Sequence, residues 1–238
     1  AELESLFEHM VMPDDVAAIL VETVVGEGGY LFPTTRWLKM VRELCDRHGI
    51  MLILDEVQSG MGRTGKMWAF EHFDVVPDIM TAAKGLGSGM PVAAVVSDKA
   101  LMDKWAPGAH GGTYGGNAVA TAAAAATLEV MRDEDLPGNA ARMGEILMAG
   151  LREIQADYPI IGDVRGLGLM VATEFVKPDG SPNPEAVKKV VENAFNDKTL
   201  LITCGTQDQG IRIVPPLVVN EEQINDFLEV YRRAVANA

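Results

Sequence analysis

The stretch IMLILDEVQSGMGRTG, residues 50 to 65, decides the fold of this chain. Its first five residues are all apolar, which predicts a strand with apolar side chains on both faces, as in a parallel sheet covered on both sides. Two carboxylates, Asp55 and Glu56, follow directly, and the chain then turns through glycines. Because ligands bind at the carboxyl edge of an open parallel sheet, acids at this position indicate a binding site as well as a strand end.

The segment before this strand predicts its parallel neighbour. Residues 16–25, VAAILVETVV, predict a fully buried strand that carries Glu22 near its end. Apolar residues at helical spacing from Trp37 through Met40 and Val41 to Leu44 predict a helix that stops at Gly49. Strand, helix and strand in this order predict a right-handed parallel crossover.

The segments that follow extend the same sheet. Residues 78–83, DIMTAA, predict a third strand, and Lys84 comes directly after it. A short glycine turn separates this strand from residues 91–97, PVAAVVS, which favours an antiparallel pairing. The sheet is therefore predicted to be mixed and mostly parallel, and the alanine-rich residues 117–131 predict a helix.

From about residue 133 the order of elements changes to an α+β pattern. The fold class is therefore α/β, with a partial large domain over residues 1–130 and a small α+β domain over residues 131–238. The segments predicted in the second domain are a helix at 140–154, a strand at 168–176, a helix after the polar turn that starts at 177, strands at 200–204 and 210–214, and a helix from Glu221.

Composition excludes several classes of protein. The formal net charge of −14 and the lack of basic runs argue against nucleic-acid partners and against an anionic membrane surface. Two isolated cysteines, Cys45 and Cys204, are too few for a disulfide framework or a zinc cluster, so no metal is expected and a reducing cytoplasm is the expected location. The first 25 residues lack the basic start of a signal peptide.

Charged residues at three strand ends indicate the chemistry. Lys84 lies between an apolar strand and glycines, where a crowded, partly dry site would favour the neutral amine that forms a Schiff base. Asp55 could keep a pyridine nitrogen protonated, and Gln58 could donate a hydrogen bond to an oxygen of the same ring. The alternatives are a surface lysine for Lys84 and a helix cap for Asp55.

Five linked motifs resemble the class III (omega-amino acid) aminotransferases. They are VETVVGEGGY, LDEVQSGMGRTG, DIMTAAKGLGSGMP, GGTYGGN and GIRIVPPL, in the order and approximate spacing of that family. The resemblance covers essentially the whole chain and implies a type I pyridoxal-phosphate fold, a homodimer, and transfer of an amino group between an amine or omega-amino acid, such as 4-aminobutyrate or ornithine, and a 2-oxo acid. It resembles only the C-terminal half of such an enzyme, because the family's phosphate-binding glycine-serine loop and ring-stacking aromatic have no counterpart here.

The resemblance assigns the cofactor site residue by residue. It implies that Lys84 forms the Schiff base with pyridoxal 5'-phosphate and that Asp55 pairs with the pyridine nitrogen. Val57 would pack against the ring and Gln58 would contact its hydroxyl. Thr113 would reach across the dimer interface to the neighbour's cofactor phosphate, and Glu56 is expected to be structural.

The resemblance also assigns substrate binding. Arg212 would clamp a substrate carboxylate, and Glu27 in the glycine-flanked GEGG would have the backbone freedom to pair with Arg212 for one substrate and swing away for the other. The alternatives are an edge-strand Arg212 in an ordinary salt bridge and a Glu27 paired with another cation. Thr23 and Val25 depart from the family's proline and glutamine in the stretch Glu-Pro-Val-Gln, which affects the pocket wall.

Two other functions share these motifs. Racemases, epimerases and aminomutases of the same fold use the same cofactor, although the aminomutase branch usually departs from the Gly-Glu-Gly-Gly kept at residues 26–29. The second alternative is a truncated chain that folds and associates but is inactive alone.

Overall fold

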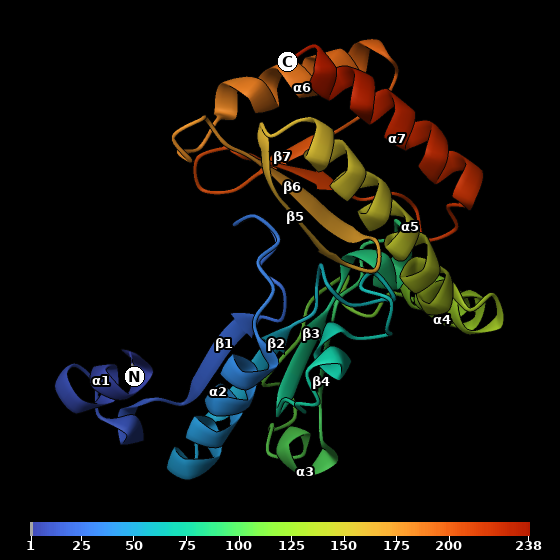
Figure 1. Cartoon of the computed structure of the whole chain (residues 1–238). Helices are drawn as coiled ribbons and strands as arrows, with labels where there is room; N and C mark the ends of the chain where they lie inside the picture. Colours follow the sequence, from blue (N-terminus) through green and yellow to red (C-terminus); the bar gives the residue numbers. More distant parts are fainter. Residues whose placement is uncertain (1) are drawn as a thin grey trace. The chain divides into compact units, whose positions relative to one another are not determined.

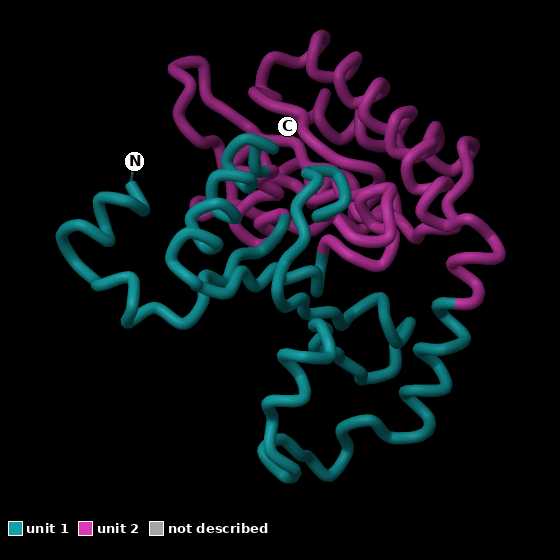
Figure 2. The backbone as a smooth tube through the Cα atoms, turned by 90° about the horizontal axis from the view of Figure 1, so that it is seen from below, with its two compact units in different colours: residues 1–23, 33–58, 70–128 teal, residues 24–32, 59–69, 129–238 magenta. Residues whose placement is uncertain are grey.

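The computed structural model describes residues 2–238, which form two compact units (Figure 2). The first unit holds the chain up to Thr23 together with Pro33–Gln58 and Phe70–Leu128. The second holds Val24–Phe32, Ser59–Ala69 and Glu129–Ala238. The change of unit after Leu128 lies close to the boundary expected at residue 130, but two short segments of the N-terminal region pack with the C-terminal unit instead.

The first unit contains a four-stranded sheet in the order β1-β2-β3-β4 (Figure 1). The β1–β2 and β2–β3 pairs are parallel, and β3–β4 is antiparallel, which confirms the predicted mixed, mostly parallel sheet. The strands are β1 (Ala18–Glu22), β2 (Met51–Asp55), β3 (Ile79–Ala82) and β4 (Ala94–Ser97).

Strand β1 is not fully buried, contrary to the sequence-based prediction. It is an edge strand that pairs only with β2, and the side chain of Leu20 is 61% exposed. A run of apolar residues predicts burial only where other elements cover the strand, and at this edge of the sheet nothing within residues 2–238 buries Leu20.

Helix α2 (Thr35–His48) connects β1 and β2, and its two ends follow ordinary capping rules. The Thr34 side chain accepts a hydrogen bond from Trp37 N at 3.1 Å, and Gly49 closes the helix in the left-handed conformation with φ 67°. The buried side chains are Leu38, Val41, Leu44 and Cys45. Trp37 and Met40, which the helical spacing placed on the apolar face, are 43% and 45% exposed.

The remaining elements up to residue 133 are short, apart from α4. They are α1 (Glu2–His9), α3 (Lys99–Met102), α4 (Ala118–Asp133) and the 3₁₀ helices η1 (Pro13–Asp15), η2 (Ala69–His72) and η3 (Lys84–Gly87). Helix α4 confirms the helix predicted from alanine content. Within residues 2–238, no helix is both long enough and apolar enough to span a membrane.

The second unit contains an antiparallel sheet in the order β5-β6-β8-β7 (Figure 1). Its strands are β5 (Ile161–Leu167), β6 (Met170–Phe175), β7 (Ile202–Cys204) and β8 (Gly210–Ile213). Its long helices are α5 (Leu136–Asp157), α6 (Pro184–Asn196) and α7 (Glu221–Ala236). All were predicted in outline except β5.

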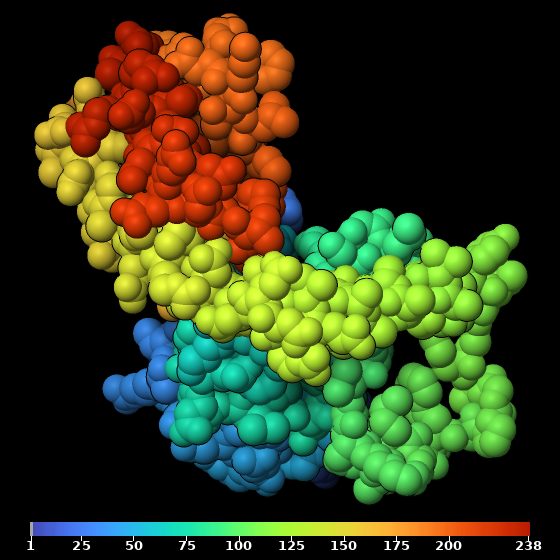
Figure 3. All heavy atoms as spheres, turned by 90° about the vertical axis from the view of Figure 1, so that its right-hand side faces the viewer, coloured from blue at the N-terminus to red at the C-terminus, as the bar shows by residue number. Residues whose placement is uncertain are grey.

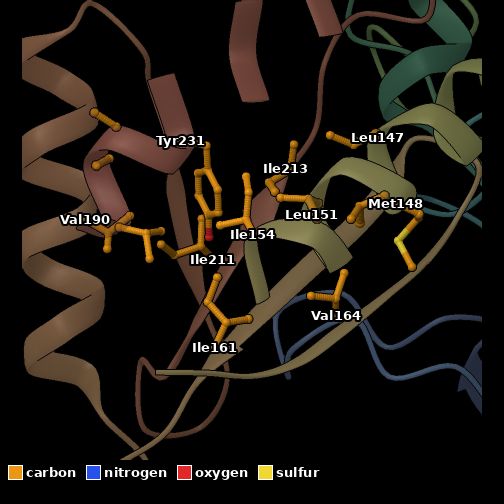
Figure 4. Close-up of a cluster of buried hydrophobic side chains, with 14 of the residues drawn as sticks. Leu147, Met148, Leu151, Ile154, Ile161, Val164, Val190, Ile211, Ile213 and Tyr231 are labelled. Atoms are coloured by element: carbon orange, nitrogen blue, oxygen red, sulfur yellow. The ribbon is translucent and has the colours of Figure 1, made fainter. Parts of the chain in front are cut away.

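The two faces of this second sheet have different neighbours. Val171, Ile211 and Ile213 belong to a core that also contains Leu151 and Tyr231 of the helices (Figure 4). Met170 and Ala172 instead belong to a smaller buried cluster with Val24, Tyr30 and Ala69. Because side chains alternate along a strand, the helices cover one face and the segments Val24–Phe32 and Ser59–Ala69 cover the other.

Candidate functional site

Three polar side chains form one row across the first sheet. Glu22 is paired with Asp55, and Asp55 is paired with Thr81, in the registers of the two parallel ladders. Residues paired in this way place their side chains on the same face of the sheet. Lys84 follows the carboxyl end of β3 two residues after the strand ends, so it lies at the same sheet edge as Asp55.

Asp55 is half-buried and uses one carboxylate oxygen in a local turn. Its Oδ1 accepts a hydrogen bond from Val57 N at 2.8 Å. This contact spans two residues and leads into turns rather than a helix, so Asp55 is not a helix cap. No residue in the described part of the chain, 2–238, bonds to Oδ2. One oxygen of the carboxylate is therefore available to a ligand.

Glu56 is fully buried and has a structural role, as expected from the sequence. Its Oε1 accepts a hydrogen bond from Phe70 N at 2.9 Å, and its own backbone N donates to Thr81 O at 3.0 Å. These contacts tie the segment after β2 to η2 and to β3. The adjacent acids thus differ in role, because alternate side chains leave the strand end in opposite directions.

Lys84 opens the 3₁₀ helix η3 in a left-handed conformation, with φ 41°. A side chain with a Cβ pays about 1–2 kcal/mol for this region, so the neighbouring structure must hold it there. The lysine is exposed, which differs from the crowded, partly dry site expected from the sequence. Gly85, Ser88 and Gly89 are exposed as well, whereas Leu86 and Gly87 of the same 3₁₀ helix are buried.

The other residues assigned to the cofactor lie at two places in the first unit. Val57 and Gln58 are half-buried and directly follow the strand end that carries Asp55. Thr113 is exposed in the segment between α3 and α4, which Figure 3 shows in green as a surface projection. No hydrogen bond or ion pair recorded for residues 2–238 links Thr113 to the residues at the sheet edge.

A buried arginine and an exposed glutamate form an ion pair in the second unit. Arg212 Nη1 donates to Glu27 Oε1 at 2.5 Å. The Arg212 side chain is 11% exposed, whereas the Glu27 side chain is 76% exposed. The Nε atom of Arg212 is buried and has no partner in the described chain. Strand β8 lies between β6 and β7, so Arg212 is not an edge-strand residue.

The backbone of the GEGG loop is anchored, contrary to the freedom expected from its glycines. Glu27 O accepts a hydrogen bond from Gly205 N at 3.0 Å, and Val25 and Leu31 close the loop with an antiparallel bridge. A Cβ on Gly28 would lie 2.8 Å from Val25 Cγ1, so glycine is required there by close packing. The mobile part of this segment is therefore the Glu27 side chain rather than the loop.

The groups around Arg212 leave Glu27 as its counter-charge. Burial raises the pKa of Tyr30 to about 12, although the guanidinium groups of Arg212 and Arg63 oppose the shift, so this phenol is neutral. Burial also raises the pKa of the Cys204 thiol. Arg63 donates to Leu169 O at 3.3 Å and Pro215 O at 2.6 Å, and burial lowers its pKa.

Sequence reasoning missed three residues at these sites. Thr81 is in register with Asp55, and its Oγ1 is buried without a partner. No sequence signal marks Thr81, because its place beside Asp55 depends on the register of the two strands. Tyr30 and Arg63 carry no sequence signal of their own, because they come near Arg212 only through the packing of short segments on the second sheet.

Comparisons with known proteins identify relatives along nearly the whole chain. A sequence profile described as Aminotransferase class-III matches residues 1–235. The 5-aminovalerate aminotransferase DavT of Pseudomonas putida is 46% identical over 237 residues, covering 99% of this chain and 56% of that protein. The 4-aminobutyrate aminotransferase GabT of Escherichia coli K12 is 41% identical over 232 residues, covering 97% and 54%. The alanine/serine racemase of Pyrococcus horikoshii is 42% identical over 230 residues, covering 97% and 48%.

Solved structures agree with these relatives. A transaminase from the marine bacterium Virgibacillus superposes with a TM-score of 0.93 at 32% identity, covering 99% of this chain and 55% of that chain. An ornithine aminotransferase from Toxoplasma gondii, with partial occupancy of PLP at its active site, gives 0.88 at 35% identity, covering 98% and 54%. The chain spans about half the length of the curated relatives it matches.

Proposed function

The chain belongs to the class III aminotransferase family, and from this premise we propose that it takes part in moving an amino group between an omega-amino acid and a 2-oxo acid. Relatives named for 5-aminovalerate and 4-aminobutyrate support this substrate class. Both name substrates with an amine at one end of a short chain and a carboxylate at the other. The racemase relative supports a second activity, considered below.

Family members depend on pyridoxal phosphate, and the residues at the first sheet edge suit this cofactor. Asp55 Oδ2 has no protein partner within residues 2–238, and Thr81 Oγ1 in the same row is buried without one. Thr81 lies on β3, the strand that leads into Lys84, and Asp55 lies on the adjacent strand β2. When bound, the cofactor supplies an electron sink that stabilises negative charge at the substrate carbon.

Each residue at this edge has a distinct role in the proposal. Lys84 would hold the cofactor covalently through its amine until the amine of the substrate displaces it, and the released Lys84 amine would then move a proton to and from the substrate carbon. The Asp55 carboxylate holds a proton on the ring nitrogen, which requires a charged acceptor at that position. Val57 packs against the ring, and Gln58 donates a hydrogen bond to the ring hydroxyl.

Thr113 is proposed to act in a homodimer. Its side chain is exposed in a glycine-bounded turn, and Asn117 begins the next helix directly after it by accepting from Ala120 N at 2.9 Å. A hydroxyl with free amides ahead of a helix is suited to an anion. We therefore assign Thr113 to the cofactor phosphate of the neighbouring subunit, as in the resemblance from sequence.

The observation that carries the proposed substrate class is the unequal burial of the Glu27–Arg212 pair. Arg212 is buried at 11% exposure and needs a negative partner, while its partner Glu27 is 76% exposed and can leave without being desolvated. A substrate carboxylate next to the reacting carbon takes its place on Arg212, and an omega-amino donor, which has none there, leaves the pair intact. Arg212 can thus serve both substrates in turn.

Amino transfer tests the proposal directly. The active holoenzyme should transfer ¹⁵N from labelled 5-aminovalerate to a 2-oxo acid, and mass spectrometry should find the label in the amino acid product. In a matched reaction without the 2-oxo acid, consumption of the amino donor should stop after one equivalent per bound cofactor. Absence of label in the product, with cofactor bound, would contradict the proposed function.

A racemase is the second candidate, because a racemase relative is 42% identical over 97% of this chain. Racemisation needs a single alpha-amino acid and no exchange at Arg212. The discriminating measurement is loss of optical activity from L-alanine without any 2-oxo acid. We expect none, and sustained racemisation that is unaffected by Glu27→Gln would favour the racemase.

We place the enzyme in the cytoplasm as part of the same proposal. Cys45 and Cys204 are both buried, and both are free thiols. Buried reduced thiols agree with a reducing compartment, where disulfides are rare. Mass spectrometry after alkylation of the native protein in cell extract should find both cysteines reduced.

A further inference from the structure

Two arginines of the second unit share one row on the same face of the sheet. Arg165 on β5 is paired with Ala172 on β6, and Ala172 is paired with Arg212 on β8. Paired residues in an antiparallel sheet project to the same side, so both guanidinium groups leave the face that is opposite to the helices. Two strand spacings separate their backbones by about 10 Å.

Arg165 binds the backbone of the loop that carries Glu27. Its Nη2 donates to Gly29 O at 2.7 Å, and its Nε donates to Gly29 O at 3.0 Å and to Tyr30 O at 3.2 Å. Gly29 is in a positive-φ conformation, at φ 121°, and Tyr30 follows at φ 53°. The guanidinium therefore holds the two residues of the loop that have a positive φ.

The charge of Arg165 is fully compensated by neighbours on its own sheet. Arg165 Nη1 lies 2.6 Å from Asp163 Oδ2, and Nη2 lies 2.8 Å from Glu174 Oε2. The Arg165 side chain is only 18% exposed. Arg212 in the same row has only the exposed Glu27 as a carboxylate partner among residues 2–238. Arg165 therefore has fixed partners on its own sheet, whereas the partner of Arg212 is one that a substrate carboxylate can replace.

We propose that Arg165 is a positioning residue for the reaction, because it fixes the backbone of Gly26–Tyr30 so that the Glu27 side chain alone exchanges with the substrate carboxylate on Arg212. This inference rests on the proposed function. The partners of Arg165 are loop carbonyls and two carboxylates of its own sheet. Arg165 acts through the loop that carries Glu27. Gly205 N donates to the carbonyl of Glu27 itself, and the guanidinium fork binds the carbonyls of Gly29 and Tyr30, two and three residues further along the loop.

Only the planar fork of arginine fits this contact. A lysine at position 165 would keep a positive charge between Asp163 and Glu174 but could not bond two successive carbonyls while binding both acids. The buried packing of Tyr30 against Ala172 would remain in the variant. Arg165→Lys therefore removes the anchor with the least disturbance of the sheet.

Hydrogen exchange measures the anchor without any activity. In Arg165→Lys, the amides of residues 26–31 should exchange about tenfold faster or more, the factor expected from loss of a charge-assisted hydrogen bond. Amides of β6 and β8 should be unchanged. Arg142→Lys is the matched control, because Arg142 is an exposed arginine of the same unit that pairs with Asp135. Unchanged exchange at residues 26–31 would overturn the inference.

Kinetics then test whether the anchor serves Glu27. In the holoenzyme, Arg165→Lys should lower kcat/KM for the omega-amino donor relative to an alpha-amino acid, in the same direction as Glu27→Gln, and the double variant should be no worse than Glu27→Gln. Arg165→Lys could speed amide hydrogen exchange and yet leave the ratio of kcat/KM values unchanged, although Glu27→Gln changes that ratio. This result would refute the positioning role of Arg165 and leave the proposed function standing. If Glu27→Gln itself leaves the ratio of kcat/KM values unchanged, the replacement of Glu27 by a substrate carboxylate on Arg212 is refuted. Amide hydrogen exchange still decides whether Arg165 anchors the loop.

A second variant covers the case in which Arg165→Lys does not fold. Asp163→Asn removes the acid that holds Nη1, and the Asp163 side chain is 54% exposed, so the fold should tolerate it. We expect a smaller rise in exchange at residues 26–31, of about two- to fivefold, with no change in α5. No rise in this variant would also count against the anchor.

Discussion

Replacing Glu27 with Gln should separate the two half-reactions of the proposed amino transfer. The change keeps the size of the side chain and an oxygen that can accept from Arg212 Nη1, but it removes the negative charge. With an omega-amino donor bound, Arg212 would then be a buried cation without a counter-charge. With an alpha-amino acid bound, the substrate carboxylate supplies that charge, so this half-reaction should be little affected.

The size of the effect follows from the environment of the pair. A hydrogen bond to a charged group contributes about 1.5–3 kcal/mol. The glutamine would keep one such bond to the Arg212 guanidinium but would lose the attraction between opposite charges. Since Glu27 is 76% exposed and partly screened by water, whereas Arg212 is 11% exposed, we expect a net loss of about 1–2 kcal/mol. The ratio of kcat/KM for omega-amino donor to alpha-amino acid should therefore fall about 5- to 30-fold.

Single-turnover spectroscopy measures each half-reaction separately, by following the cofactor absorbance after mixing with one substrate. Glu192→Gln is a matched control, because Glu192 lies exposed on α6 and the same charge is lost. It should leave the ratio unchanged. Equal losses in both half-reactions for Glu27→Gln would refute the exchange at Arg212 and leave Glu27 as a structural acid.

Three further predictions address the cofactor site and the stability of the second unit. Asp55→Ala should still bind the cofactor at Lys84. It should lower the rate of amino transfer by about two orders of magnitude or more, because the ring nitrogen loses its charged partner. Transfer at the wild-type rate would contradict this role of Asp55. Tyr231→Phe should lower the free energy of unfolding, measured in urea, by about 1–3 kcal/mol. The Tyr231 hydroxyl lies 2.6 Å from Thr173 Oγ1 in the buried core, so the threonine would lose its partner. An unchanged urea concentration at the unfolding midpoint would be evidence against this. Burial raises the pKa of Tyr30 from 10.0 to about 12, so the native state favours the protonated phenol. The free energy of unfolding of the wild type should therefore fall as pH rises through this range, and Tyr30→Phe should lose less stability over the same range. Parallel curves of stability against pH for the two proteins would count against the shift.

The first sheet could be predicted because its strands end at chemically distinct residues. The apolar run before Asp55 and the helix that ends at Gly49 each combine a periodic pattern with an unambiguous stop. Burial could not be predicted in the same way. The apolar composition of β1 is that of a covered strand, yet its edge position leaves Leu20 exposed, and position in a sheet is a property of the whole fold.

Strand β5 was missed because its sequence, IGDVRGL, has little apolar alternation. Gly162 is required by packing, since a Cβ there would lie 2.7 Å from Val176 Cγ1. Asp163 and Arg165 face the loop side of the sheet, where their charges pair with each other. Arg165, one of the charged residues that interrupt the apolar pattern of β5, is also the residue that holds the GEGG loop.

In the candidate site too, some residues could be identified from the sequence, whereas their burial and packing could not. Lys84, Asp55 and Arg212 were found because strand ends and motifs mark them, and the pairing of Arg212 with Glu27 is now seen directly. The exposure of Lys84 and the fixed backbone of the GEGG loop were not predictable, because both depend on what packs nearby.

Covalent labelling of the cofactor lysine tests the central claim most directly. Sodium borohydride converts a lysine–cofactor linkage into a stable amine, and peptide mass spectrometry of the reduced holoenzyme then locates it. We predict a single labelled peptide that contains Lys84, with no label in the Lys84→Ala variant or in protein incubated without pyridoxal phosphate. A stoichiometric label on any other lysine of the chain would contradict it.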